Sequence, residues 1–566
     1  MMLTLPPPAV AAARDRRPVP PRRLALLLVL GWAGQVCVRL WMARTRTGPA
    51  AVPDESGYLA AARLLAGGPG ADLSGHTFYQ GGYSLLFTPA YWVTHDPATV
   101  YLLVIVLNAL VGAAVFPLGY AAARRLGMAP GAALTVSWAA ALLPAVTFFG
   151  AFALADAVLP AASLGWLLLL DRFARDGRVA DAAGASAVAA YACAVHTRGT
   201  ILLAVHCAAL AVLAFRRLRP ALFGIAVAVS GYAAAGALND RLRAELYPGG
   251  VRDLGDNVVT RLTTVEGQAW ALSGAAGQLW YLVVSTWGLG GVGLVAVAAA
   301  LARRRAAFGT RVMAGTLLVV TLGIAYASSA ALPDEHRVGN FAYGRYLSCL
   351  ALVHTLVGLA VLARAGTRTA VRCALGAGAV LAVTGAWVMA YAGKRLRTHL
   401  YIAFDFPETN FLTLDQKGFH LPEASLAALG LVAAFLVARR FGWTAVAVAL
   451  AAVNLAALTF TMGTSSRRVV PVLPLPGPAA GGVAVDVNAH WRTHVSLVDQ
   501  VWWTRIGRVD VRAGVPADVC TVVVPRAAGA AVESTWPGHP AGWRAHTGET
   551  AGHAWVAWRA PSCPAR

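Results

Sequence analysis

Residues 24–43, LALLLVLGWAGQVCVRLWMA, form an apolar run that contains one charged side chain, Arg39. Twenty helical residues extend about 30 Å, which is the thickness of the hydrocarbon core of a bilayer. Residues 1–23 place five Arg among prolines directly before this run, as in a signal peptide, but no convincing small-residue cleavage site follows. We therefore expect an uncleaved first membrane span, preceded by the tail 1–23.

Runs of the same kind recur as far as residue 462 and predict about thirteen membrane helices. They lie near 24–43, 100–122, 130–150, 153–170, 180–196, 199–215, 220–238, 281–302, 311–330, 345–364, 372–391, 424–438 and 443–462. The stretch 82–93 is shorter and predicts a re-entrant or surface helix. The transmembrane domain is therefore expected to be all-α and to cover residues 24–462.

The composition also indicates a membrane protein. The chain of 566 residues is 58% hydrophobic and 13% charged, with a mean hydropathy of +0.60. Soluble domains are about half apolar and a quarter charged. This difference excludes a soluble enzyme, a disordered protein and a secreted disulfide scaffold.

The net charge of +21 comes from short arginine clusters between the apolar runs rather than from one continuous basic patch, so no nucleic-acid partner is expected. The clusters fall on every second connection, and basic residues in short loops mark the cytoplasmic side of a membrane. We expect a multi-pass protein of the plasma membrane with a cytoplasmic N-terminus and an extracytoplasmic C-terminus. The external segments are then 44–99, 239–280, 331–344, 392–423 and the tail that follows the last span.

The tail divides into a Pro-rich linker, 463–480, and a segment, 481–566, long enough for a small domain. Strand-like runs at 482–487, 519–524 and 554–558 predict an extracytoplasmic domain of α/β or β-rich type. It contains no nucleotide-binding or catalytic motif. Cys520 and Cys563 can form a disulfide if this domain faces an oxidising compartment.

Two adjacent carboxylates, Asp54 and Glu55, follow the first span in the sequence VPDESGY (52–58). Carboxylates beside a membrane are costly to desolvate and need a reason. One interpretation is helix capping, in which Asp54 or Ser56 begins a helix over 57–66 with acidic residues at its positive end. The other is a functional site.

The surrounding sequence favours the second interpretation. Residues 53–127 resemble the first loop and following span of the GT-C glycosyltransferases, integral-membrane enzymes that use polyprenyl-phosphate sugars, including the aminoarabinose transferase and protein O-mannosyltransferase branches. The resemblance rests on Pro53-Asp54-Glu55, Tyr58, Arg63, Tyr79-Gln80-Gly81-Gly82-Tyr83, Pro89 and Arg124-Arg125-Leu126-Gly127. It implies a general base for the acceptor hydroxyl at Asp54, with Glu55 as the second candidate. The chain departs from the family at Gln80-Gly81, where members often have Pro.

Two further charged residues stand where the resemblance implies a role. Asp156 follows an apolar run at an external boundary, where the family has an acid beside the first one; the alternative is a cap for the next helix. Arg345 and Tyr346 open the span 345–364, where the family has an Arg-Tyr pair that contacts the donor phosphate. Arg can hold a phosphate bidentately, and the alternative is interfacial anchoring.

The remaining candidates depend on position alone. His196 and Arg198 mark an external turn that can add positive charge near the phosphate or can be purely structural. Candidates in the loops on the acceptor side are Tyr58, Tyr83, His76 and Glu266. A divalent metal ion could bridge Asp54, Asp156 and the phosphate, but no ligand spacing requires one, and no other cofactor is expected.

These residues predict a glycosyltransferase, hexosyl or pentosyl, that moves one sugar from a polyprenyl-phosphate donor to an envelope glycan, lipid or protein. A single displacement by the acceptor hydroxyl would invert the anomeric centre. The alternatives are a flippase or transporter of lipid-linked glycans and a non-catalytic envelope assembly protein. A transporter should show charges at the membrane midplane and inverted repeats, and neither is evident in the sequence.

Overall fold

The computed structural model describes residues 20–51, 53–252, 254–463, 481–500, 503–550 and 552–561. Most of the expected tail 1–23 and nearly all of the expected linker 463–480 lie outside the described residues. The same holds for Cys563, and therefore for its expected pairing with Cys520.

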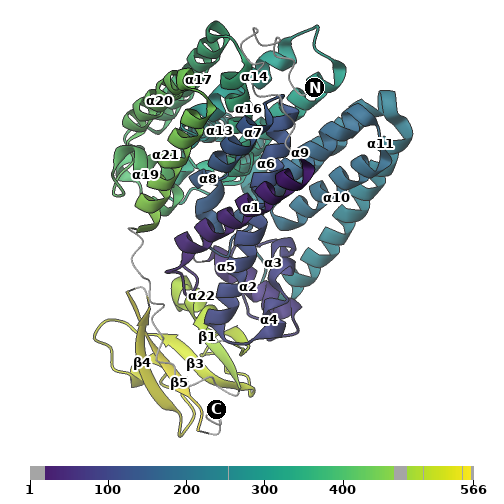
Figure 1. Ribbon diagram of the computed structural model, residues 1–566. Coiled ribbons are helices and arrows are strands. Elements are labelled where there is room, and N and C mark those ends of the chain that lie inside the picture. Colours follow the sequence, from purple (N-terminus) through teal and green to yellow (C-terminus); the bar gives the residue numbers. More distant parts are fainter. Residues whose placement is uncertain are drawn as a thin grey trace.

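The first half of the chain folds into long helices joined by short ones (Figure 1). They are α1 (Pro21–Ala43), α2 (Asp54–Leu65), α3 (Gly81–Phe87), α4 (Ala90–Val93), α5 (Pro97–Ala113), α6 (Val115–Arg125), α7 (Pro130–Ala140), α8 (Pro144–Thr147), α9 (Leu159–Asp176), α10 (Val179–Val195) and α11 (Thr197–Leu246). Two 3₁₀ turns, η2 (Phe148–Ala151) and η3 (Ala155–Ala157), lie between α8 and α9. The stretch 82–93, expected as one re-entrant or surface helix, contains two short helices, α3 and α4.

The second half completes the helical domain. Its helices are α12 (Gly255–Thr263), α13 (Val265–Val284), α14 (Leu289–Ala302), α15 (Phe308–Ala331), α16 (Ser348–Arg364), α17 (Thr367–Ala392), α18 (Arg395–Thr398), α19 (Pro407–Thr413), α20 (Leu421–Ala438) and α21 (Trp443–Gly463). The 3₁₀ turns are η4 (Val338–Asn340), η5 (Gly344–Leu347), η6 (Ala403–Asp405) and η7 (Arg439–Phe441). Residues 239–280, expected as an external loop, are thus mostly helical.

The described residues contain eight helices long and apolar enough to cross a membrane, or up to ten if each of two bent pairs is one span. The chain is therefore a multi-pass membrane protein, but the expected number of about thirteen spans is not confirmed. Three differences account for the gap. α10 has 17 residues, α9 has four charged residues near its end, and α11 is a single element kinked at Arg217 where two spans were expected.

The two bent pairs show that one apolar run can contain two helices with a break between them. The expected span 281–302 is wrong as one helix, because α13 and α14 meet at 114°. Gly288 at the break has φ 77°, a left-handed conformation that glycine adopts without strain. The pair of α7 with α8 and η2 bends by 70°. There Arg39 of α1 donates hydrogen bonds to the carbonyls of Ala141 (3.0 Å) and Val146 (3.2 Å), which satisfies groups that the break leaves free.

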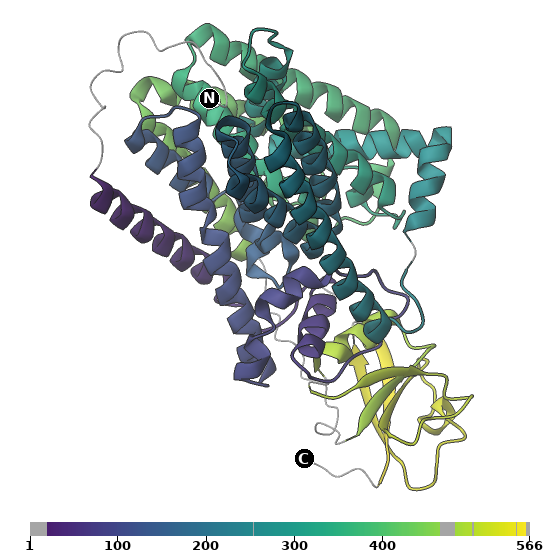
Figure 2. The same cartoon turned by 90° about the vertical axis from the view of Figure 1, so that its right-hand side faces the viewer.

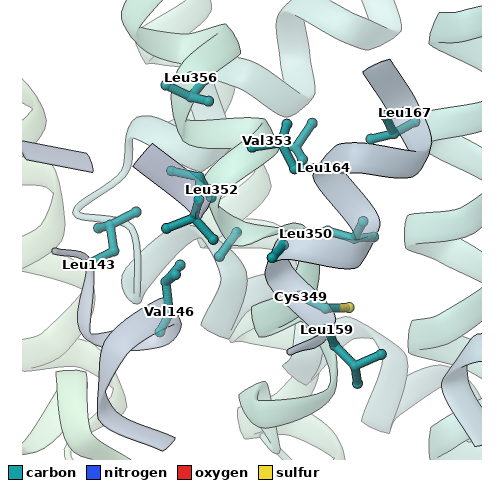
Figure 3. Close-up of a cluster of buried hydrophobic side chains, with 14 of the residues drawn as sticks. Leu143, Val146, Leu159, Leu164, Leu167, Cys349, Leu350, Leu352, Val353 and Leu356 are labelled. Atoms are coloured by element: carbon teal, nitrogen blue, oxygen red, sulfur yellow. The ribbon is translucent and has the colours of Figure 1, made fainter. Parts of the chain in front are cut away.

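A cluster of buried apolar side chains fixes α16 at the centre of the helical domain (Figure 3). Leu350, Val353 and Leu356 of α16 lie beside Leu159 and Leu164 of α9 in this cluster. Every residue of α16 from Ser348 to Leu362 is buried. The residues that open α16 are therefore held on a rigid, enclosed support.

The C-terminal domain is a five-stranded mixed sheet in the order β2-β1-β3-β5-β4, in agreement with the expected small domain. The elements are β1 (Gly482–Asp486), α22 (Trp491–Gln500), β2 (Ile506–Val509), β3 (Val519–Pro525), β4 (Arg544–Thr550) and β5 (His553–Arg559). β1 pairs in parallel with β2 and β3, while β5 pairs antiparallel with β3 and β4. The expected strand-like runs fall in β1, β3 and β5.

This sheet packs against one end of the helical domain, with α22 beside α2 (Figures 1 and 2). Residues 71–72 extend its edge, since Asp72 donates its backbone N–H to the carbonyl of Ile506 (2.9 Å). Apolar side chains from α2, the end of α11 and the sheet share one buried cluster. The first loop therefore lies between the helices and the C-terminal domain.

Candidate active site

Asp54 is the first residue of α2, and it does not cap this helix, which was the alternative to a functional role in the sequence. Pro53 occupies the N-cap position, and no side chain caps the helix. One carboxylate oxygen of Asp54 accepts a hydrogen bond from Arg345 Nη1 (2.8 Å), and the other accepts one from the Tyr79 hydroxyl (2.9 Å). The side chain of Asp54 keeps 32% of its surface exposed. Asp54 is thus both anchored and accessible.

Glu55, the adjacent carboxylate, is completely buried. Oε1 accepts the backbone N–H groups of Ala50 and Ala51, both at 2.7 Å. Oε2 accepts the Ala153 N–H and the Tyr101 hydroxyl, also at 2.7 Å. These four hydrogen bonds connect the start of the first loop to the segment before α9. Glu55 therefore stabilises the fold at this point.

Asp156 lies in η3, a short turn before α9, and is 3% exposed. Arg198 Nη2 donates to Oδ1 (2.7 Å) and Arg345 Nε donates to Oδ2 (2.8 Å). Burial alone would raise the pKa of Asp156, but the two guanidinium groups outweigh it, and the net pKa lies below the usual range. The N-cap of α9 is Val158, so Asp156 does not cap that helix.

Arg345 joins the two aspartates. It lies in η5, at the entrance to α16, and its guanidinium bonds Asp156 through Nε and Asp54 through Nη1. Nη1 also donates to the Tyr343 hydroxyl (3.3 Å), and the guanidinium lies 5.4 Å from the centre of the Phe149 ring. Within the described residues, Nη2 of Arg345 donates no hydrogen bond.

Arg198 completes a chain of alternating charges that we call the carboxylate–arginine cluster: Asp54, Arg345, Asp156 and Arg198. Nη1 of Arg198 donates to the backbone carbonyls of Arg345 (3.0 Å) and Tyr346 (3.2 Å). The four formal charges cancel, as buried charges require. The side chains of the other three members are at most 9% exposed, so Asp54 forms the accessible end.

His196 and Tyr346 border the cluster. His196 is the N-cap of α11, and its Nδ1 accepts the backbone N–H of Arg198 (3.2 Å). The Tyr346 ring is half-buried and packs against both the His196 ring and the Arg198 guanidinium. The turn at 196–198 therefore has a structural role and also places Arg198 beside Asp156.

The sequence matches no family model and no curated protein. Among solved structures, it is similar to the crystal structure of ArnT from Cupriavidus metallidurans bound to undecaprenyl phosphate, with 15% identity over 94% of this chain and 98% of that chain and a TM-score of 0.53. The apo structure of the same protein gives a TM-score of 0.50 at 15% identity, over 95% and 99% of the two chains. The chain has the GT-C fold.

A further likeness is to the cryo-EM structure of arabinosyltransferase EmbB from Mycobacterium smegmatis. It has 15% identity and a TM-score of 0.41, and it covers 92% of this chain but 46% of that one. The two ArnT structures, which cover nearly the full length of this chain, confirm the expected GT-C fold.

Three tyrosines of the first loop, Tyr58, Tyr79 and Tyr83, pack against one another beside Asp54. Tyr58 and Tyr83 are buried, with ring centres 5.0 Å apart, and the Tyr83 hydroxyl donates to Asn108 (2.9 Å). Tyr79, part of the quoted motif but not among the expected site residues, contacts Asp54 directly. Its only signal in the sequence was its place in that motif.

Two expected loop residues lie apart from the carboxylate–arginine cluster. His76 packs against Trp491 and His494 of the C-terminal domain, with ring centres 6.2 and 6.0 Å away. Glu266 is exposed in the first turn of α13, and no described residue links it to the cluster by a hydrogen bond or ion pair.

A further acid lies near the carboxylate–arginine cluster and was not predicted from the sequence. Asp405, in η6, is buried and lies 3.9 Å from Arg337, whose guanidinium stands over the Tyr343 ring. Burial raises the pKa of Asp405 to about 6, although Arg337 and Arg345 act in the opposite direction. Nothing in the sequence 404–408, FDFPE, distinguishes this acid from the other acids between the apolar runs.

A metal ion bridging Asp54 and Asp156 does not fit these side chains. Both oxygens of Asp156 already accept from guanidinium groups, and Arg345 occupies the space between the two aspartates. Among the described residues, no group of three or more His, Cys, Asp or Glu is placed to hold an ion. The chemistry below therefore uses the side chains of this chain alone.

Proposed function

We propose that this protein is a membrane glycosyltransferase that moves one sugar from a polyprenyl-phosphate donor to a hydroxyl of an extracytoplasmic acceptor. The observation that carries the proposal is the accessible carboxylate of Asp54, held by an arginine that is itself fixed on a buried aspartate. A base and a phosphate-binding cation stand side by side, as displacement of a phosphate by a hydroxyl requires.

Asp54 is the base in this proposal. The acceptor hydroxyl donates its proton to the Asp54 carboxylate while its oxygen attacks the anomeric carbon of the donor sugar. The bond from that carbon to the phosphate oxygen breaks, and the polyprenyl phosphate leaves with the electron pair. Tyr79 and Arg345 fix the carboxylate by one hydrogen bond to each oxygen, which orients it before the acceptor arrives.

Arg345 stabilises the leaving phosphate. Its Nε and Nη1 are committed to aspartates, and Nη2 has no hydrogen bond within the described residues, so this donor is left for a phosphate oxygen. Asp156 and Arg198 are positioning residues, since Asp156 orients the guanidinium and Arg198 holds Asp156 and the backbone of η5. Tyr346, half-buried beside Arg198, borders the same space.

The nature of the donor is supported by the fold. One solved structure with this fold, that of ArnT, was determined with undecaprenyl phosphate bound, and the present chain covers 98% of that chain. Because the phosphate is the leaving group and the acceptor attacks directly, transfer should invert the anomeric centre. The sugar is a hexose or a pentose, and the acceptor is an envelope glycan, a lipid or a protein.

The topology belongs to the same proposal. The N-terminus lies in the cytoplasm, while the carboxylate–arginine cluster and the C-terminal domain face the extracytoplasmic side. Cysteine labelling of intact cells with a membrane-impermeant maleimide tests this. Ser534→Cys should react, whereas Arg304→Cys, in the connection between α14 and α15, should react after the cells are opened; the reverse pattern contradicts the orientation.

Purified protein incubated with radiolabelled polyprenyl-phosphate sugars and a panel of glycan, lipid and peptide acceptors tests the reaction itself. We expect transfer from at least one donor, with the product anomer opposite to that of the donor by NMR. A product that retains the donor configuration contradicts direct displacement. Movement of the intact lipid-linked sugar across vesicles without any transfer would instead indicate a flippase.

A further inference from the structure

A polar cavity of about 200 Å³ lies outside the carboxylate–arginine cluster, between the first external loop and the C-terminal domain. Both parts of the chain contribute to its wall. The lining residues are Ser74, Gly75, His76, Asp486, Ala489, Trp491, His494 and Arg508. The cavity thus exists because the sheet docks on the loop, and its wall is specific to this arrangement.

The wall combines an accessible aromatic face with polar side chains. Trp491, at the start of α22, is 41% exposed, and its ring borders the His76 ring. The His76 and His494 rings are nearly parallel, at 21°. Arg508 Nη1 donates to the carbonyl of Ser74 (3.2 Å), which closes one side of the cavity.

His494 is the buried histidine of the wall. It is 3% exposed, and its Nε2 has no hydrogen-bond partner within the described residues. Buried polar atoms are nearly always paired, so this one is an exception among the residues that surround the cavity. Burial, with His76 and Arg508 nearby, lowers the pKa of His494 to about 4, which makes its ring neutral at physiological pH.

We propose that this cavity binds one uncharged sugar ring of a glycan. A sugar ring presents an apolar face that can lie on Trp491 and hydroxyl groups that can bond to His76 and Arg508, the accessible polar side chains of the wall. The volume is below the roughly 300–1,000 Å³ of pockets for drug-sized ligands, so it suits a single ring. The formal charges of Asp486 and Arg508 offset each other, which disfavours a phosphate or another strongly charged group.

The loop connects this cavity to the proposed base. His76 lies three residues before Tyr79, the donor to Asp54. The segment between them is held by hydrogen bonds from Arg252 N–H to the His76 carbonyl (2.9 Å) and from the Tyr247 hydroxyl to the Thr77 carbonyl (3.1 Å). We assign the bound ring to the acceptor glycan, and this assignment rests on the proposed function.

Binding of neutral trisaccharides to the full chain in detergent tests the cavity without relying on transfer. The probes are the trisaccharides of mannose, glucose, galactose and arabinose, followed by saturation-transfer NMR and calorimetry. Wild type should bind at least one of them saturably. Trp491→Ala should weaken that binding at least tenfold, and Ala489→Leu, which fills the cavity, should do the same.

Trp92→Ala is the matched control, because Trp92 is 68% exposed on α4 and does not line the cavity. It should bind as wild type does, and inorganic phosphate should not compete with the trisaccharide. Saturable binding to none of the four probes, or equal binding by Trp491→Ala, overturns the proposal. Competition by phosphate overturns it in favour of an anion site.

The two proposals fail separately. Asp54→Asn should lose transfer and keep trisaccharide binding, while Trp491→Ala should raise the acceptor KM. If Asp54→Asn transfers sugar normally, the proposed base is wrong, and the Trp491 result still decides the cavity. If trisaccharides bind through Trp491 but neither accept sugar nor inhibit transfer, the cavity binds a glycan other than the acceptor, and its assignment as the acceptor site is wrong.

Discussion

Asp54 and Glu55 are neighbours in the chain with different environments. Asp54 accepts one hydrogen bond on each oxygen and is partly exposed, whereas Glu55 accepts four hydrogen bonds and has no exposed surface. Because the two residues are adjacent and both acidic, the sequence could not show which carboxylate stays accessible. The difference arises because the backbone of residues 50–51 and 153 folds onto Glu55.

We predict that Glu55→Gln destabilises the protein by roughly 3 kcal/mol, because the amide NH₂ would face N–H or O–H donors and leave two of them unpaired. The thermal unfolding midpoint in detergent, followed by tryptophan fluorescence, measures this. Glu266→Gln, at an exposed position, is the control and should unfold as wild type does. Equal midpoints for both variants would show that Glu55 does not hold the loop.

Asp405 gives a pH-dependent prediction. The pKa of Asp405 is about 6 in the folded chain, mainly because of burial, and about 3.9 in an unfolded one. An acid whose pKa is raised by folding stabilises the fold while it is protonated. That contribution is complete below about pH 4 and is lost as the pH rises through about 6.

Asp405→Asn should therefore gain stability relative to wild type as the pH rises from 4.5 to 7.5, by roughly 2 kcal/mol. Unfolding midpoints across this range check it. Asp240→Asn, whose side chain is 75% exposed, should show no such gain. A pH-independent difference between Asp405→Asn and wild type would mean that Asp405 is not buried as described.

At the scale of elements, apolar runs located the membrane helices because hydropathy alone decides where a helix can reside in lipid. They did not locate the breaks. The turn after α7 depends on Arg39 from another helix, and the turn between α13 and α14 depends on Gly288 in a chain already rich in glycine. Tertiary contacts of this kind leave no periodic signal in the sequence.

Arg39→Met should destabilise the protein by roughly 2–4 kcal/mol, because the carbonyls of Ala141 and Val146 would lose donors in an environment without water. Arg44→Met is the matched control, since Arg44 is exposed just beyond the same helix and bonds its own turn. Unfolding midpoints of the two variants in detergent compare them. If Arg39→Met is as stable as Arg44→Met, Arg39 does not stabilise the bend after α7.

At the scale of the whole molecule, the fold brings together residues from four distant segments, at positions 54, 156, 198 and 345. Asp156 and Arg345 stood out in the sequence because each is charged at the end of an apolar run. Their contact could not be derived from the sequence, since it depends on how α9, α11 and α16 pack. The GT-C resemblance implied in advance that Asp156 lies beside Asp54 and that Arg345 contacts the donor phosphate, whereas Arg198 was a candidate from its position alone. Asp405 and the docking of the sheet on the first loop had no signal in the sequence or in the resemblance.

The most direct test of the account is the rate of sugar transfer by Asp54→Asn, measured with radiolabelled donor beside Asp240→Asn and together with donor-lipid binding. Loss of a general base costs about a hundred- to ten-thousand-fold in rate. We predict a fall of that size for Asp54→Asn with donor binding retained, and wild-type transfer for Asp240→Asn. Transfer by Asp54→Asn at the wild-type rate would contradict the central claim.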